Sequence, residues 1–326
     1  MTVNNTMNIR KMNIELVRSA LLKNNGLTKN EICTATELSL ASCTNILKIL
    51  MDSGEIKNVI DCESTGGRRA KRFYINEQHE LVLTIITMQE EDYVKMDYRI
   101  VDLSGNVVYS LITEEKEYHD DKVEAQVDIL FKDYPNIKAI GISIAGILED
   151  DHIHNANDYV FELGNLPKRL QALFKVPTVI ENDLNLAVLG YAALVPEEAD
   201  KGIVLIDRGL GAGIYANGQL LKGASNFAGE IMYYPEEGMR QVFDLSVKQQ
   251  VDLLVKICTS IAAIINPAII GISGYQQKDL DYIALKMERY IPKAHLPRLV
   301  LIESKEDQIL KGIIQLTLSL LKKKIM

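Results

Sequence analysis

The segment Thr65-Gly66-Gly67-Arg68-Arg69-Ala70-Lys71-Arg72 places four cations within five positions, directly after two glycines. It separates two short apolar runs, residues 56–60 and 73–75, that have the composition of strands. Two such runs joined by a Gly-rich turn predict a β-hairpin that carries its positive charge at the tip. Glycines at the tip allow its backbone to approach another molecule closely.

The residues before this hairpin predict two helices. Apolar residues recur at helical spacing over residues 14–22, and Asn25-Gly26 breaks that pattern. Thr28 is placed to cap a second helix over residues 29–35, and Glu31 completes a capping box with it. We therefore expect two helices joined by a short turn.

A third helix is expected after a Glu37-Leu38 turn, with Ser39 as its cap and Gly54 at its end. Its apolar residues recur at i, i+3, i+4 and i+7, so they form one buried side: Cys43, Ile46, Leu47 and Leu50. The exposed side carries short polar groups and one cation: Ser42, Thr44, Asn45 and Lys48.

Three helices followed by a basic hairpin predict a winged helix-turn-helix over residues 1–76, with double-stranded DNA as its partner. The polar side of the third helix is suited to base edges and phosphates in the major groove. The hairpin cations would neutralise backbone phosphates, and an arginine at the tip could enter a minor groove: Arg68, Arg69, Lys71 and Arg72. The alternative is that these cations form a solvated hairpin face.

The charge distribution agrees with this division. Residues 1–76 hold 11 Lys and Arg against 7 Asp and Glu, a net charge of +4, whereas the other 250 residues hold 25 against 37, a net charge of −12. The basic character is thus local, because the acidic remainder would repel DNA.

Length and composition bound the rest of the chain. With 326 residues, 47% of them hydrophobic, two or three domains are expected. The most apolar stretch, residues 257–272, is interrupted by Asn266-Pro267 and is too short to span a bilayer, so we expect a cytoplasmic protein without membrane contact. The four cysteines have no paired spacing, which favours neither a disulfide framework nor a zinc site: Cys33, Cys43, Cys62 and Cys258.

The remaining residues alternate between strand and helix patterns. Three antiparallel strands are expected over residues 81–88, 93–102 and 106–113, followed by a helix over 122–133 and a buried strand over 139–144. A further strand is expected at Val179-Ile180. The pattern restarts after Pro196 with strands at 202–207, 213–215 and 219–220, and an amphipathic helix over 307–321 ends the chain.

Several motifs, taken in order, resemble those of the ROK family (repressor, open reading frame, kinase). Thr65 to Arg69 resembles the wing signature of its repressor branch, and Gly141-Ile142-Ser143-Ile144-Ala145-Gly146-Ile147 is similar to its Gly-rich sugar loop. Glu181-Asn182-Asp183-Leu184-Asn185 resembles its sugar-contacting segment, and residues 209–231 follow its second-lobe signature.

The resemblance implies an α/β fold in which the winged helix-turn-helix precedes a two-lobed, actin-like or ribonuclease H-like body. We expect a first lobe from residues 77–195 with 305–326 and a shortened second lobe from residues 196–304. The resemblance also implies ligand contacts from Gly146, Asn182, Asp183 and Glu230. An alternative for Asn182 and Asp183 is a turn or a helix cap, since such pairs are common at strand ends.

The departures from the family pattern concern phosphate and zinc. Family kinases place Asp-Ile-Gly-Gly-Thr on the ATP phosphates, but here the stretch is Thr87-Met88-Gln89-Glu90-Glu91-Asp92, whose carboxylates would repel a triphosphate. Asp207-Arg208-Gly209 stands where Gly-Thr-Gly is usual, and Tyr233 replaces a zinc-binding histidine. We therefore expect no cofactor, no metal and no catalytic residue.

The leading hypothesis is a homodimeric transcriptional regulator, most simply a repressor of sugar-metabolism genes, whose inactive kinase-like body senses a sugar or sugar phosphate. One alternative is an ATP-dependent sugar kinase, which rests on Asp183. The other is a DNA-binding protein with no effector.

Overall fold

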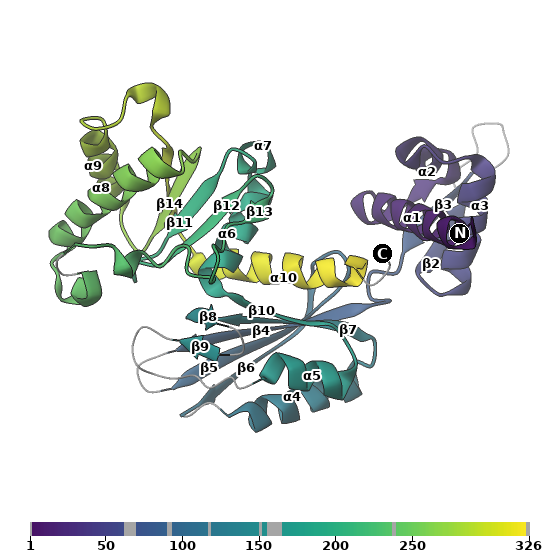
Figure 1. The fold of residues 1–326 in the computed structure, drawn as a ribbon. Helices are drawn as coiled ribbons and strands as arrows, with labels where there is room; N and C mark the ends of the chain where they lie inside the picture. The colour runs from purple at the N-terminus through teal and green to yellow at the C-terminus, as the bar shows by residue number, and fades with distance from the viewer. Residues whose placement is uncertain are drawn as a thin grey trace.

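The computed structural model describes residues 2–61, 70–89, 93–116, 119–149, 152–154, 165–236 and 239–323. An N-terminal unit, residues 2–75 and here called the head, lies to one side of a larger body (Figure 1). The body is built around two five-stranded sheets. Within the described ranges, no helix is both long enough and apolar enough to cross a bilayer.

The head follows the order that the sequence predicts. Its elements are α1 Thr2–Lys23, β1 Leu27–Thr28, α2 Lys29–Thr36, α3 Leu40–Asp52, β2 Ile56–Asp61 and β3 Lys71–Ile75. The three strands form an antiparallel sheet in the order β1-β3-β2. The capping box is present, because Glu31 accepts a hydrogen bond from the Thr28 N–H and donates its own N–H to the Thr28 hydroxyl. Ser39 caps α3 through the Ser42 N–H, also as expected.

The predicted apolar side of α3 is buried. It contacts α1, α2 and the sheet through a common core: Val17, Leu21, Ile32, Cys43, Ile46, Leu47, Leu50, Ile56, Phe73 and Ile75. The opposite side of α3 lies outside the core of the head, because an amphipathic helix buries only its apolar face.

The first body sheet has the order β10-β7-β4-β5-β6. Its strands are β4 Leu81–Gln89, β5 Val94–Val101, β6 Val107–Glu115, β7 Ile137–Ile144 and β10 Thr178–Asn182. The predicted antiparallel set β4, β5 and β6 is confirmed, and β7 is parallel to both of its neighbours. A small separate pair, β8 Ile147–Glu149 and β9 His152–His154, follows β7.

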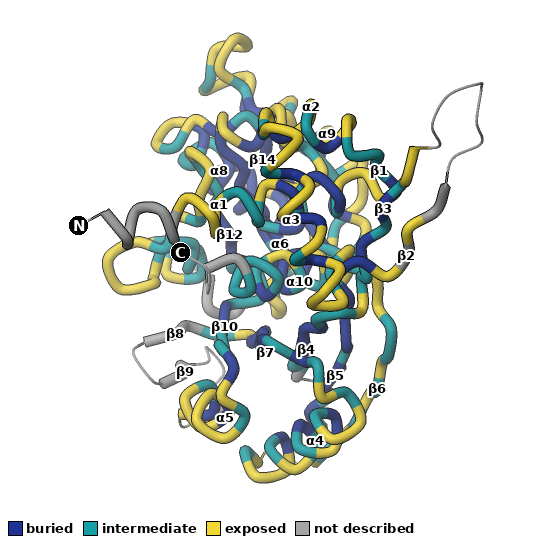
Figure 2. The backbone as a smooth tube through the Cα atoms, turned by 90° about the vertical axis from the view of Figure 1, so that its right-hand side faces the viewer, coloured by how far each residue is buried: buried dark blue, intermediate teal, exposed yellow. Residues whose placement is uncertain are grey.

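Helices α4 Asp120–Asp133 and α5 Leu166–Phe174 cover one face of this sheet (Figure 1). Their inner sides join its apolar core, while their outer sides are exposed (Figure 2).

The second body sheet has the order β13-β12-β11-β14-β15. Its strands are β11 Ile203–Ile206, β12 Ala212–Ala216, β13 Gln219–Leu220, β14 Ile269–Ser273 and β15 Arg298–Ile302. Helices α8 Val247–Ile264 and α9 Gln277–Met287 pack on one face. The remaining short elements are α7 Pro196–Ala199, η1 Ile231–Tyr233, η2 Met239–Asp244 and η3 Lys293–His295.

Two helices lie between the sheets and pack against each other: α6 Asp183–Leu194 and α10 Lys305–Lys323. They cross at glycines. A Cβ atom on Gly190 of α6 would lie 2.1 Å from the Gln308 carbonyl oxygen, and one on Gly312 of α10 would lie 1.9 Å from the Leu186 carbonyl oxygen. Only residues without a side chain permit this backbone approach.

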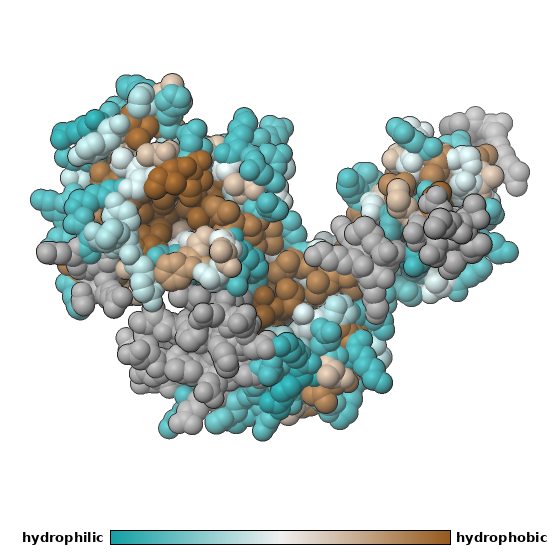
Figure 3. Space-filling model, in the orientation of Figure 1, coloured by the Kyte–Doolittle hydropathy of each residue, from teal (hydrophilic) through white to brown (hydrophobic). Residues whose placement is uncertain are grey.

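Helix α10 also rests on the first sheet and continues toward the head (Figure 1). A Cβ on Gly141 of β7 would overlap the Thr317 hydroxyl of α10, so this glycine seats the helix on the sheet. Apolar side chains of the region around α10 are visible on the surface between body and head (Figure 3).

Gly190→Ala and Gly312→Ala should each lower the free energy of unfolding by about 2 kcal/mol or more, because a methyl group would overlap a backbone carbonyl. The sign is informative, since glycine to alanine inside a helix normally stabilises by about 1 kcal/mol. Urea denaturation measures the change. Gly209→Ala is the matched control, because its Cβ would meet nothing closer than 3.9 Å. A Gly312→Ala protein as stable as the parent would contradict this crossing.

Candidate functional site

The polar side of α3 is the first candidate surface. Thr44, Asn45 and Lys48 are exposed, as the sequence predicts. Ser42 is only half-buried, and its hydroxyl lies 2.9 Å from the Ser39 hydroxyl at the helix cap. Three of the four expected contact residues therefore point away from the core, while Ser42 also contributes to capping.

The cations of the hairpin divide into three cases. Arg68 and Arg69 lie outside the described residues. Lys71 is exposed at the start of β3. Arg72 turns back onto the head, where its guanidinium donates to the Gly26 carbonyl at 2.6 Å and pairs with Glu31 at 3.2 Å.

Glu31 therefore takes part in two interactions, the capping box of α2 and the ion pair with Arg72. The sequence predicted only the first. Hydrogen bonds from Thr28, first from its backbone and then from its hydroxyl, lower the pKa of Glu31, and the charge of Arg72 adds to this. Arg72 is thus partly neutralised inside the head, so its charge is less available to a DNA phosphate than that of Lys71.

The second candidate region begins where β10 runs into α6. Asn182 caps α6, since its side-chain oxygen accepts from the N–H groups of Leu184 at 2.8 Å and Asn185 at 3.1 Å. Its side-chain amide donates to the Gly146 carbonyl at 2.9 Å. The structure brings the expected residues Asn182 and Gly146 together, and it uses most of their polar groups within the chain.

Asp183, the first residue of α6, faces a cation from α10. The Lys305 ammonium lies 3.8 Å from an Asp183 carboxylate oxygen and 3.0 Å from a carboxylate oxygen of Asp207, which follows β11. The Ser273 hydroxyl, at the end of β14, donates to the other Asp207 oxygen at 2.5 Å. These side chains, here called the Lys305 bridge, join α6 and α10 to the second sheet.

The Lys305 bridge shifts the pKa of each member. Burial raises the pKa of Asp183, and the charge of Asp207 adds to this while Lys305 opposes it. Burial alone would raise the pKa of Asp207, but Lys305 and Ser273 hold it below its usual value. Burial alone would lower the pKa of Lys305, but the two carboxylates outweigh it and raise the pKa. Lys305 therefore stays protonated at neutral pH.

A second ion pair lies beside the first. Glu181 is only 3% exposed, accepts from Asn185 at 3.0 Å and from the Asn182 N–H at 3.1 Å, and pairs with Lys222, which follows β13. Breaking such a buried pair on one side leaves an uncompensated charge and is costly. This pair also ties the first sheet to the second.

Glu230 reaches the same region from the second sheet. The carbonyl of the preceding Gly229 accepts from the Ala212 N–H at 2.8 Å, and this glycine has a φ of +102°. Burial, and then the charge of Asp183, raise the pKa of Glu230. The charges of Asp183 and Glu230 therefore interact, but Glu230 lines a separate hollow beside β12 and α8 and not the cavity that Asp183 lines. The Tyr233 ring packs against the Phe227 ring in a tilted arrangement, with ring centroids 5.0 Å apart and the ring planes at 54°.

Asp183 and Lys305 also line a cavity of about 280 Å³ between the end of β4 and the start of α10. Its walls are formed by Ile86, Thr87, Met88, Asp97, Arg99, Ala145, Asp183, Lys305, Glu306, Asp307, Ile309 and Leu310. Glu90, Glu91 and Asp92, which the sequence places after β4, lie outside the described residues. Over the residues that the structure does describe, no group of three His, Cys, Asp or Glu side chains is placed to hold a metal ion.

Sequence reasoning missed the Lys305 bridge and the Glu181–Lys222 pair. Lys305 and Asp207 are 98 positions apart, and no local pattern marks either as a partner of the other. A Ser304 cap before the last helix was the only available signal that Lys305 begins a helix, where its side chain would lie near a strand end.

Part of the body is similar in sequence to known proteins. The sequence profile of the ROK family matches residues 95–239. The xylose repressor of Staphylococcus xylosus is 28% identical over 237 residues, which cover 67% of this chain and 59% of that protein. The chain thus spans about three fifths of the length of the curated relatives it matches.

Two solved structures show the fold. A ROK family transcriptional regulator, described as a homologue of the Escherichia coli MLC protein, superposes with a TM-score of 0.68 at 18% identity, over 98% of this chain and 99% of that one. The ROK hexokinase of Thermus thermophilus superposes with a TM-score of 0.58 at 14% identity, over 74% of this chain and 99% of that one. The body has the α/β fold of these proteins.

Proposed function

We propose that this protein is a DNA-binding transcriptional regulator, most simply a repressor, whose body binds a sugar or sugar phosphate without phosphorylating it. The observation that carries the proposal is the exposed polar side of α3 on a head that stands clear of the body (Figure 1). The names of the similar proteins, a xylose repressor and a ROK transcriptional regulator, support it.

The head fits a winged helix-turn-helix. Helices α2 and α3 form the helix-turn-helix, and β2 with β3 forms the stem of the wing. Helix α3 has 13 residues and is about 20 Å long, and the diameter of an α-helix with its side chains, about 10–12 Å, matches a major groove about 12 Å wide. Thr44, Asn45 and Lys48 would contact base edges and phosphates, while Lys71 with Arg68 and Arg69 would contact phosphates beside the groove.

The body fits a two-lobed kinase fold that has kept its sugar-contacting residues and lost its nucleotide-binding loops. In kinases of the family the two phosphate loops present glycines, whereas here the second loop presents the Asp207 carboxylate, already bonded to Lys305 and Ser273. A triphosphate would have to displace Lys305 from two carboxylates and then face both of them. These residues do not fit a nucleotide.

The division of the chain at residues 76, 195 and 304 belongs to the same proposal. The first lobe would hold β4 to β10 with α10, and the second lobe would hold β11 to β15. The Lys305 bridge and the Glu181–Lys222 pair then cross the cleft between the lobes, and a ligand seated at Asp183 and Glu230 would change their spacing.

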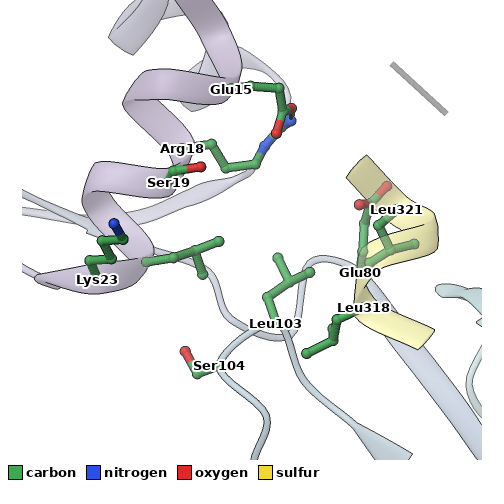
Figure 4. A pocket seen from close by; sticks show the side chains of 10 residues that line it. Glu15, Arg18, Ser19, Lys23, Glu80, Leu103, Ser104, Leu318 and Leu321 are labelled. Carbon is green, nitrogen blue, oxygen red and sulfur yellow. Dashed lines mark ion pairs between the residues drawn. The ribbon is translucent and has the colours of Figure 1, made fainter. Parts of the chain in front are cut away.

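Helix α10 offers a direct route from this cleft to the head. It begins at Lys305, has 19 residues, and so extends about 28 Å. Near its other end, Leu318 and Leu321 line a cavity of about 450 Å³ whose opposite wall is formed by Arg18, Ser19 and other residues of α1 (Figure 4). A tilt of α10 at the cleft would therefore displace the cavity wall that faces α1 of the head.

Glu77, in the segment that joins head and body, contacts both of them. Its carboxylate accepts from the Asn25 side chain of the head at 3.2 Å and from the Ser104 hydroxyl of the body at 3.1 Å. It also lies 3.6 Å from the Lys57 ammonium of the head. In a homodimer, two heads held in this way would bind half-sites at one spacing only, so a ligand that moves α10 would weaken DNA binding.

Asn45→Ala should relax the preference for particular bases, at a cost of about 1–3 kcal/mol for the best site. Lys71→Ala should weaken binding to all sequences and reduce the salt slope by about one. Titration of the purified protein onto DNA from its own locus, at several salt concentrations, measures both. Lys132→Ala, on the outer side of α4, is the control. The proposal fails if the parent protein shows no salt-sensitive, sequence-selective binding.

Glu77→Ala should leave operator affinity within a few-fold of the parent but reduce ligand-induced release by about tenfold, since coupling energies between sites are typically a few kcal/mol. The assay is DNA binding with and without the effector, and Glu114→Ala on β6 is the control. An unchanged response to the effector would show that the Glu77 contacts do not carry the signal.

ADP release in a coupled assay, over a panel of hexoses and amino sugars with ATP and Mg²⁺, should stay at the background rate. The physical reason is the carboxylate of Asp207 in place of a phosphate loop. The raised pKa of Asp183 would suit a general base, so it favours the sugar-kinase alternative. Turnover that Asp183→Asn abolishes would establish that alternative instead.

A further inference from the structure

The charges around the cavity that Asp183 and Lys305 line, here called the Asp183 cavity, would act differently on a free sugar and on its phosphate ester. We propose that the effector is an uncharged, unphosphorylated sugar, and that the cavity rejects sugar phosphates. This inference rests on the sensing part of the proposed function and deepens it, because that function leaves both ligand classes open.

The cavity wall is acidic overall. It contains four carboxylates and two cations: Asp97, Asp183, Glu306 and Asp307 against Arg99 and Lys305. Asp207 adds a further carboxylate behind Lys305. A phosphate monoester brings a charge of about −1.5 to −2 at neutral pH, so it would enter a region of the same sign.

Both cations of the cavity wall are already paired. The Arg99 guanidinium donates to Asp97 through Nε at 2.9 and 3.1 Å and through a terminal nitrogen at 2.7 Å. The Lys305 ammonium is shared between Asp183 and Asp207. Arginine and lysine are the side chains that normally receive phosphate, so among the described lining residues a phosphate would have to break an existing ion pair to gain one.

The helix N-termini at the cavity are also capped by side chains of the protein. Free N–H groups at a helix start form a common phosphate site. At the start of α6 the Asn182 side chain accepts from the N–H groups of Leu184 and Asn185. At the start of α10 the Ser304 hydroxyl accepts from the Asp307 N–H at 3.1 Å, and Glu306 and Asp307 place two carboxylates in the first turn.

An uncharged polyol meets none of these obstacles. Its hydroxyl groups can donate to the Asp183 carboxylate, which is the one expected ligand residue among the described residues that line this cavity. A volume of about 280 Å³ lies at the lower end of the range for small-molecule sites, which suits a monosaccharide rather than a larger ligand.

The test is isothermal titration of the full-length protein with matched pairs. The probes are D-glucose and N-acetyl-D-glucosamine, each with its 6-phosphate, together with D-xylose and inorganic phosphate. We expect at least one free sugar to bind, and its phosphate ester to bind about a hundredfold more weakly or not at all. The difference should shrink as salt is added. A phosphate ester that binds as tightly as its parent sugar, or a panel in which no free sugar binds, overturns the inference.

A charge variant tests the cause. Glu306→Gln with Asp307→Asn removes two exposed carboxylates near the cavity, and should reduce the discrimination against the phosphate ester by about tenfold. Asp128→Asn with Asp133→Asn, on the outer side of α4, makes the same change in net charge far from the cavity and should leave the discrimination unchanged. Equal effects of both pairs would show that net charge, not the cavity, excludes phosphate.

Failure of this inference and failure of the proposed function give different results. If the phosphate ester binds and releases operator DNA, the regulator stands and the ligand class is wrong. If a free sugar binds selectively but the protein ignores DNA, the ligand class stands and the regulator is wrong.

Discussion

The close crossing of α6 and α10 is the contact on which the rest of the body depends. Gly190 and Gly312 bring each helix backbone against a carbonyl oxygen of the other, at a separation that no side chain would allow. Gly213 of β12 likewise meets the Leu184 carbonyl, so α6 is held just as tightly against the second sheet. Because the helix starts carry Asp183 and Lys305, the position of these charges is set by backbone packing, not by flexible loops.

The charges at the starts of these two helices are the basis for the proposal that the body does not bind a nucleotide. A phosphate site needs donors that have no other partner. Here the lysine at the start of α10 is held by two carboxylates, one from each side of the cleft. The same pairing links the sheets, so in the proposed function the interaction that would exclude a nucleotide would also make the distance between the sheets depend on what binds at Asp183.

The head and the cleft are joined by one rigid element and one junction. Helix α10 extends from Lys305 to the cavity beside α1, and the Glu77 carboxylate holds the head to the β5–β6 turn at Ser104. Polar contacts at a junction are individually weak, so they can be rearranged by a few kcal/mol of ligand binding energy. A stronger apolar interface would have fixed the head permanently.

The sequence by itself determined the local elements. Periodicity, the Thr28–Glu31 capping box and the glycine-containing turns act over a few residues. They predicted the head, the strands of the first sheet, β11, β12 and β13 of the second sheet and the segment around Asp183, but not β14 and β15. Tertiary structure alone decided the contacts between distant residues: Arg72 pairs with Glu31 across 41 positions, Asn182 donates to the Gly146 carbonyl across 36 positions, and Lys305 meets Asp207 across 98 positions. Ion pairs between distant segments leave no periodic trace in a sequence, because their geometry exists only after the helices and sheets have packed.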